Sequence, residues 1–185
     1  MPEIGDETDR GERIAANAGA EKEAWGATLD DMRALAEEYE AEGWSTVTIQ
    51  AGYAAPTTPG DDDDRFGLVY VIPGNEAEPF VDAVEAGEFP RFEVHRAEVE
   101  GKVFLVTTLL DPGTETAILL AGTYEMRNAL RCARMADDRG EMFTHVQKLD
   151  GTRLGSFRHE EHEQFFPSIT AIENWADVDG AAMDY

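Results

Sequence analysis

Three short turn sequences, each lying between two strand-like stretches, constrain the fold more than any other feature of the chain. They are Glu100–Gly101, Asp111–Thr114 and Asp150–Thr152, and each combines an acidic residue with glycine. Turns this short join neighbouring antiparallel strands, whereas parallel strands need a crossover of about a dozen residues or more. The chain is therefore predicted to build its sheet largely from hairpins.

The apolar pattern supplies the elements that these turns connect. Apolar residues at helical spacing predict a helix that is capped by Thr28 and ends near Gly43. Further helices are expected around Phe80, over Thr123–Arg139 and, as one or two turns, within Glu160–Phe166. Alternating or continuous apolar residues predict strands at Trp44–Tyr53, Phe66–Ile72, Phe92–Val99, Val103–Leu110, Thr116–Ala121, Met142–Leu149 and Arg153–Arg158.

The resulting order, α-β-β-α-β-β-β-α-β-β-α, is typical of an α+β fold. We expect a mostly antiparallel, bent sheet of about six to seven strands with helices packed on one face. A doubly wound parallel sheet is the alternative, and the scarcity of long crossovers argues against it. A single domain is expected over residues 23–176, between a mobile acidic arm at 1–22 and an acidic tail at 177–185.

The charge of the chain limits its partners. Asp and Glu number 39 against 15 Lys and Arg, which gives a net charge of −24, and only three of the basic residues are Lys. We interpret this charge as adaptation to molar salt, where the Debye length falls to about 3 Å and self-repulsion is screened. The alternative is an acidic surface that mimics nucleic acid or binds basic partners. The same charge argues against binding to nucleic acid.

Two absences bear on the expected location. The single cysteine, Cys132, leaves no intramolecular disulfide, as is usual in a reducing cytoplasm. No stretch approaches the roughly 18 apolar residues of a membrane helix, and the first residues lack the basic and apolar parts of a signal peptide. We therefore expect a soluble, cytoplasmic protein with no membrane partner.

The clearest candidate for a binding site is a row of arginines. Arg127, Arg131 and Arg134 occur at i, i+4 and i+7, so the predicted helix places them on one face. Guanidinium groups bind phosphate or carboxylate in a bidentate manner, and this row, with Arg158 as a helper, indicates a small-anion site. The alternative is that the same arginines pair with carboxylates of this acidic chain.

Three histidines form a second candidate site. His159 and His162 lie at i, i+3, and His145 in the preceding strand supplies a third imidazole. Three protein ligands and a water are the usual ligand set of catalytic zinc. The hypothesis is a metal site with Glu160 or Glu163 as general base. The spacing differs from the i, i+4 of the zincin motif, and solvated surface histidines are the alternative.

Other reactive residues lie in weaker contexts. Cys132 has arginine neighbours that lower a thiol pKa, although a lone helical cysteine is more often a small buried hydrophobe. Ser156 lacks the spacing of a nucleophile elbow, and the sequence contains no glycine-rich phosphate loop. The run Asp61–Asp64 favours a solvated loop over a site for Ca²⁺ or Mg²⁺.

The stretch Arg127–Pro167 contains the phrases ALRCAR, THVQKLDGT and LGSFRHEEHEQFFP. In these phrases the chain resembles an uncharacterised family of proteins from halophilic archaea, and the similarity extends over about residues 28–167. The family has no assigned activity. The resemblance therefore implies salt adaptation and nothing about chemistry or site residues.

Three functional hypotheses follow from these patterns. The leading one is a non-enzymatic binding or regulatory domain, with a small anion held by the arginine row. The second is a metal-dependent hydrolase that uses the three histidines. The third is a protein-interaction module whose partner is another protein. The sequence alone does not decide whether the chain is an enzyme, or which cofactor or ligand it binds.

Overall fold

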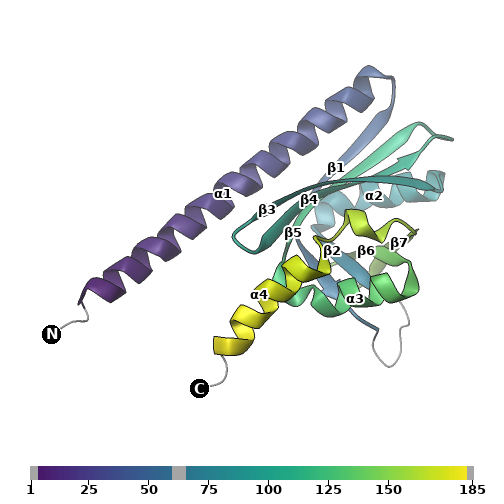
Figure 1. The fold of residues 1–185 in the computed structure, drawn as a ribbon. Coiled ribbons are helices and arrows are strands. Elements are labelled where there is room, and N and C mark those ends of the chain that lie inside the picture. The colour runs from purple at the N-terminus through teal and green to yellow at the C-terminus, as the bar shows by residue number, and fades with distance from the viewer. Residues whose placement is uncertain (1–3, 60–65, 183–185) are drawn as a thin grey trace.

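The structure, a computed structural model, describes the backbone of residues 4–59 and 66–182 and the side chains of residues 17–59 and 66–176. Its helices are α1 (Ile4–Ala41), α2 (Gly74–Ala86), α3 (Leu130–Arg139) and α4 (Ile169–Ala182), with 3₁₀ turns η1 (Met126–Asn128) and η2 (His162–Gln164) (Figure 1). Its strands are β1 (Ser45–Thr57), β2 (Gly67–Ile72), β3 (Arg91–Val99), β4 (Lys102–Asp111), β5 (Thr116–Glu125), β6 (Met142–Lys148) and β7 (Arg153–His159).

The seven strands of the described chain form one sheet in the order β3-β4-β5-β1-β2-β6-β7. Two neighbouring pairs, β1–β5 and β2–β6, are parallel, and the others are antiparallel. The prediction of an α+β fold with a mostly antiparallel, bent sheet is therefore confirmed. Each of the three predicted turns joins an antiparallel pair, namely β3–β4, β4–β5 and β6–β7.

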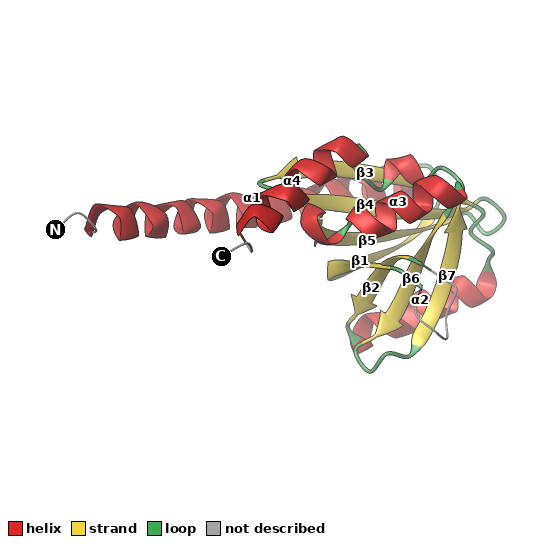
Figure 2. Cartoon of the chain, turned by 60° about the horizontal axis from the view of Figure 1, so that its bottom comes forward, coloured by secondary structure: helices red, strands yellow, loops and turns green. Residues whose placement is uncertain are grey.

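The sheet curls far enough to bring its two edge strands, β3 and β7, close together (Figure 2). The rings of Phe92 on β3 and His159 on β7 lie 4.3 Å apart, measured between centroids. Phe165, from the segment after β7, lies 5.4 Å from Phe92 and 4.7 Å from His159. The residues that follow β7 therefore fill the gap between the two edges of the sheet.

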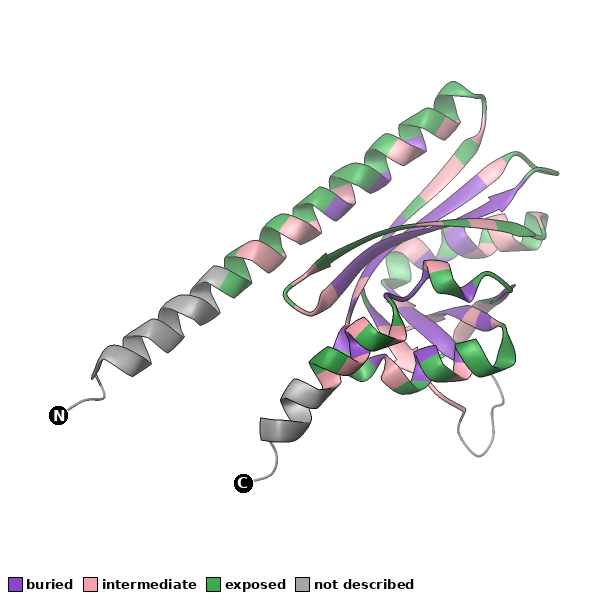
Figure 3. Cartoon of the chain, viewed as in Figure 1, coloured by how far each residue is buried: buried purple, intermediate pink, exposed green. Residues whose placement is uncertain are grey.

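Two hydrophobic cores lie on opposite faces of the sheet. Along β4, Leu105 and Leu109 belong to the larger core and Val106 and Leu110 to the smaller one, because successive strand residues point to opposite faces. Helices α2, α3 and α4 contribute buried residues to the larger core, whereas α1 packs on the smaller one. The helices therefore cover both faces of the sheet, and the prediction that they pack on one face is wrong. Figure 3 shows this buried layer between the sheet and the helices.

Helix α1 is longer than predicted. It begins at Ile4, so from that residue on the expected amino-terminal arm is part of the helix, and its first half extends past the sheet (Figure 1). Thr28 lies inside this helix, where its hydroxyl donates to the carbonyl of Ala24 at 2.7 Å, and the predicted cap there is wrong. The residues before Thr28 are rich in Ala and Glu, which favour helix, but the apolar pattern begins only where the helix meets the sheet, at Trp25.

Two other boundaries differ from prediction. Strand β5 continues to Glu125, which pairs with Lys102 of β4, so the helix expected from Thr123 starts later as η1 and α3. Helix α4 was not predicted, and it extends to Ala182, into the residues expected to form an acidic tail. Its Ile172 is fully buried in the larger core, and this packing stabilises a helix whose apolar pattern is short.

Candidate functional site

The four arginines predicted to bind an anion are spread over three elements. Arg127 lies in η1, Arg131 and Arg134 lie in α3, and Arg158 lies on β7. Three of them contact carboxylates of the chain itself. The pairs are Arg127 Nε with Glu125 at 2.6 Å, Arg134 Nη2 with Glu173 of α4 at 2.8 Å, and Arg158 with both Glu141 and Glu160. About half of each of these three arginine side chains is exposed to solvent.

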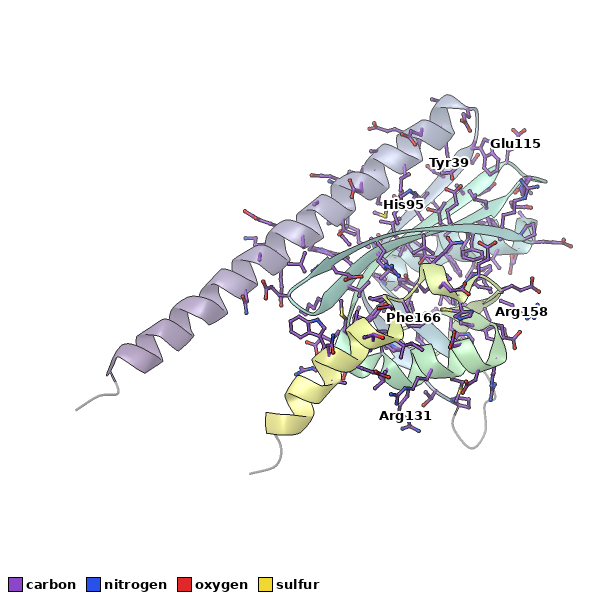
Figure 4. All side chains as sticks on the ribbon, in the orientation of Figure 1. Tyr39, His95, Glu115, Arg131, Arg158 and Phe166 are labelled. Atoms are coloured by element: carbon purple, nitrogen blue, oxygen red, sulfur yellow. The ribbon has the colours of Figure 1, made fainter. Side chains whose placement is uncertain are left out.

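The remaining arginines of α3 differ from one another. Arg131 points away from the body of the protein (Figure 4). The guanidinium of Arg139 lies 5.1 Å from the centre of the Phe66 ring, a cation–π contact. Between Arg127 and Arg158 the chain holds seven of its 15 basic residues but only four of its 39 acidic ones. This stretch of the sequence therefore carries more basic than acidic residues, although its arginines do not converge on one pocket.

The three histidines predicted to bind a metal point in different directions. His145 pairs with Ser156 across the β6–β7 hairpin, and its Nδ1 lies 2.8 Å from the hydroxyl of that serine. His159 lies on the opposite face, where its Nε2 is 2.8 Å from the hydroxyl of Thr144. His162 belongs to η2. Within the part of the chain that the structure describes, no group of three or more His, Cys, Asp or Glu residues is arranged to hold a metal ion.

His159 is part of the packed interior. Its ring contacts the rings of Phe92 and Phe165, and the residue is 2% exposed. Burial disfavours the charged imidazolium, and with a smaller effect from His145 it lowers the pKa of His159 to about 3. The ring is therefore neutral at ordinary pH and contributes to the packing between β3 and β7.

His162 is a buried residue whose ring nitrogens both lack a hydrogen-bond partner within the described chain. Its side chain is 9% exposed. Its Nε2 lies 3.5 Å from Asp137 of α3 and 3.8 Å from the carboxylate of Glu163, both of which are exposed. These contacts become ion pairs only when the imidazole is protonated.

A cleft of about 300 Å³ opens beside His162. Its polar lining comes from β3, α3 and the segment around η2, and consists of Arg96, Asp137, His162, Glu163 and Ser168. Its apolar lining consists of Ala133, Phe166, Pro167 and Ile169. The cleft therefore combines charges of both signs with an apolar wall. Phe166, which belongs to that wall, lies just before α4 (Figure 4).

Two hydrogen bonds hold the segment that forms this cleft. Arg96 Nη1 donates to the carbonyl of Glu163 at 3.3 Å, and the Tyr124 hydroxyl donates to the carbonyl of Phe165 at 2.5 Å. Ser168 accepts from the backbone N–H of Ala171 at 3.2 Å, which places it at the start of α4. The position of the cleft is thus set by β3, β5 and α4 together.

Sequence reasoning singled out His162 and, as a candidate general base, Glu163, but it missed the other side chains of the cleft. Arg96 was assigned only to a strand, and Asp137 only to a helix. The run of His and Glu residues at 159–163 was the one local sequence feature that pointed to this site. Arg96 reaches it because the sheet curls until β3 meets the segment after β7, and no local pattern encodes that contact.

The remaining candidates have structural positions. Cys132 is buried with its Sγ 3.5 Å from the carbonyl of Gly67, and burial raises its pKa to about 12, so the small buried hydrophobe is the correct interpretation and the thiolate nucleophile is not. A wider cleft between β3 and β7 brings Arg91 and Arg158 together with Glu93, Glu160 and Glu161, so carboxylates outnumber guanidinium groups there. The Asp61–Asp64 run lies outside the described residues.

Comparison with known proteins places the chain in a family. A family model covers residues 11–167, which is most of the chain. The protein belongs to this family, DUF7529, a family of unknown function. No curated protein and no solved structure matches the chain. In the described part of this DUF7529 protein, no helix is both long enough and apolar enough to cross a membrane.

Proposed function

We propose that this DUF7529 protein is a non-enzymatic binding domain whose small ligand occupies the cleft beside His162. The observation that carries the proposal is a buried imidazole with no hydrogen-bond partner for either nitrogen among the described residues. A buried polar atom left without a partner costs about 1–3 kcal/mol, and in native proteins such atoms usually meet a ligand or an ordered water. A ligand that supplies those partners recovers that energy.

The lining of the cleft supports a small organic ligand. Small-molecule sites combine an apolar wall with a few polar groups that fix orientation, and their volumes start at about 300 Å³. The cleft has such a wall in Phe166, Pro167 and Ile169, beside the polar groups of Arg96 and Asp137. A free inorganic anion uses only the arginine and leaves the apolar wall without a contact, so we favour an organic ligand.

The position of the cleft gives the binding a regulatory role. Its lining belongs to β3, α3, the η2 segment and α4, which are far apart in the sequence. A ligand that touches all of these elements stabilises their contact, because binding to the native state alone shifts the folding equilibrium toward it. We therefore expect occupancy to be sensed by the segment between β7 and α4.

We also propose that this protein is adapted to the salt-rich cytoplasm of a halophilic archaeon. This proposal rests on the net charge of −24 and on the presence of only three lysines. Raising KCl from 0.1 M to 2 M shortens the Debye length from about 10 Å to below 3 Å. We expect the melting temperature to rise steadily across that range. A melting temperature that is independent of KCl argues against this reading of the charge.

A thermal melt in 2 M KCl tests the binding function. The compounds added are the twenty amino acids, common nucleotides, sugar phosphates and zinc chloride, the last of which tests the metal hypothesis for His145, His159 and His162. A compound at 100 times its Kd adds about 2.7 kcal/mol of stability. For a chain of this length we expect a rise of about 5–10 °C.

Two variants locate the binding. His162→Phe removes both ring nitrogens, and we expect it to abolish the rise, whereas Arg131→Gln changes a side chain that points away from the fold and leaves the rise intact. A rise that survives His162→Phe places the ligand elsewhere and contradicts the proposal. If no compound raises the melting temperature or shifts the His162 ring signals in NMR spectra, the binding function is wrong.

A further inference from the structure

We infer that the ligand of this cleft is a small zwitterion with an apolar side group, of the α-amino-acid class. The inference rests on the proposed function and specifies its ligand. It starts from the fact that one cleft of about 300 Å³ is lined both by a guanidinium, from Arg96, and by two carboxylates, from Asp137 and Glu163.

The two carboxylates form the end that attracts a cation. Asp137 and Glu163 lie 3.5 Å and 3.8 Å from Nε2 of His162, and this imidazole is the one basic group with which the described structure pairs them. Two carboxylates around an imidazole repel a free anion but attract an ammonium group. Because the described residues offer no three-ligand arrangement for a metal, an organic ammonium fits these carboxylates better than a metal ion does.

Arg96 and the start of α4 form the end that attracts an anion. The guanidinium donates to the carbonyl of Glu163 at 3.3 Å, and its closest ion-pair contact is a carboxylate oxygen of Glu98 at 4.0 Å, on the outer limit for such a pair. Several of its five N–H groups are therefore available to another acceptor. Ser168 and Ile169 open the 14-residue helix α4 beside it, and a helix amino end favours negative charge. A ligand carboxylate fits this end.

The rest of the cleft lining is apolar. Ala133, Phe166 and Pro167 belong to it, so an aliphatic side group is buried where it gains from leaving water. A molecule with an ammonium, a carboxylate and a short aliphatic branch satisfies all three parts at once. The buried His162 lies at the ammonium end, where a ring nitrogen without a partner among the described residues can accept a hydrogen bond from the ligand.

A matched set of three compounds tests this assignment by calorimetry in 2 M KCl at pH 8. The probes are L-leucine, 3-methylbutan-1-amine, which lacks its carboxylate, and 4-methylpentanoate, which lacks its ammonium. We expect leucine to bind at least tenfold more tightly than either analogue. The same titrations with the other aliphatic amino acids and with glycine betaine measure the preference for the side group and for a protonated amine.

Variants assign each end of the ligand. We expect Arg96→Gln to weaken leucine at least tenfold and to leave the amine unchanged, and Asp137→Asn to weaken leucine and the amine but not the acid. Arg131→Gln and Asp138→Asn are the matched controls, since both residues are exposed on α3 and neither lines the cleft. Circular dichroism melts of every variant check that the fold is retained.

The possible failures are distinguishable. If the amine or the acid alone binds as tightly as leucine, or if a nucleotide or sugar phosphate binds in a His162-dependent way and the amino acids do not, the zwitterion assignment is wrong and the binding function stands. If leucine binds but Arg96→Gln and Asp137→Asn have no effect, the assignment to this cleft is also wrong. If no probe of any class binds in a His162-dependent way, both the assignment and the binding function fail.

Discussion

The arginines in and around α3 and the histidines at the end of β7 and in η2 are the two groups of candidate residues that stand out in the sequence, and they differ in burial. Three of the arginines are more than half exposed and contact carboxylates of the chain, namely Arg127, Arg134 and Arg158. His159 and His162 are buried, and His162 lacks hydrogen-bond partners within the described residues. The number of charges therefore says less about a binding site than burial does, because water and nearby carboxylates already satisfy an exposed charge.

The largest effect that this comparison predicts is on the segment after β7. Phe165 is fully buried against Phe92 and His159, so Phe165→Ala leaves a cavity beside the two sheet edges. We expect a loss of about 3–5 kcal/mol in the free energy of unfolding, measured by urea denaturation. Arg134→Ala on α3 is the control and should cost about 1 kcal/mol or less. Similar losses for the two variants contradict the distinction between the regions.

A second prediction concerns pH. Because the pKa of His159 is about 3 in the folded protein and about 6.5 when unfolded, the unfolded chain takes up a proton that the folded chain does not as pH falls below 6.5. Stability is therefore complete above pH 6.5 and decreases toward pH 3, by about 1.4 kcal/mol per pH unit from this residue.

Urea denaturation between pH 7.5 and 5 measures this dependence. His159→Phe keeps the aromatic packing and should remove about one proton from the slope of stability against pH. Equal slopes for the wild type and His159→Phe show that His159 titrates normally in the folded state.

The third prediction is a gain in stability. His162→Phe removes two buried nitrogens that lack hydrogen-bond partners in the described structure, so without ligand we expect it to stabilise the protein by about 1 kcal/mol at pH 8. His162→Leu, a smaller residue, guards against overpacking by phenylalanine. Destabilisation by both variants indicates that the ring has partners, such as ordered water, in the ligand-free protein.

The smallest expected effect belongs to Arg131. This side chain points away from the protein, so Arg131→Gln should change the free energy of unfolding by no more than about 0.5 kcal/mol (Figure 4). It should also leave binding of sulfate or inorganic phosphate, measured by calorimetry, no different from that of the wild type. Measurable phosphate binding that this variant abolishes favours the original arginine-row site over the cleft.

Local patterns predicted the hairpins well because the turn chemistry is local. Glu100, which has a φ of 50°, and Gly101, with 79°, adopt the left-handed conformation that a tight hairpin turn needs, and Gly151 does so with 89°. Strands β4 and β5 were likewise predicted from local residues, and their successive side chains alternate between the two cores in the structure. The start of α1 and the presence of α4 could not be predicted in this way. Among the side chains that the structure describes, α4 adds only Ile172 to the larger core and α1 joins the smaller core from Trp25 on, so the apolar patterns of both helices are short.

The α+β class, the three hairpins and the acidic character of this DUF7529 protein could be derived from its sequence, because each follows from residues close together or from composition. Tertiary structure alone decided the parallel pairs β1–β5 and β2–β6, the separation of His145 from His159, and the meeting of Arg96 with the segment around His162. The physical reason is that these contacts join distant parts of the chain. They form because the sheet curls around a shared apolar core, and that collapse is non-directional and leaves no local pattern.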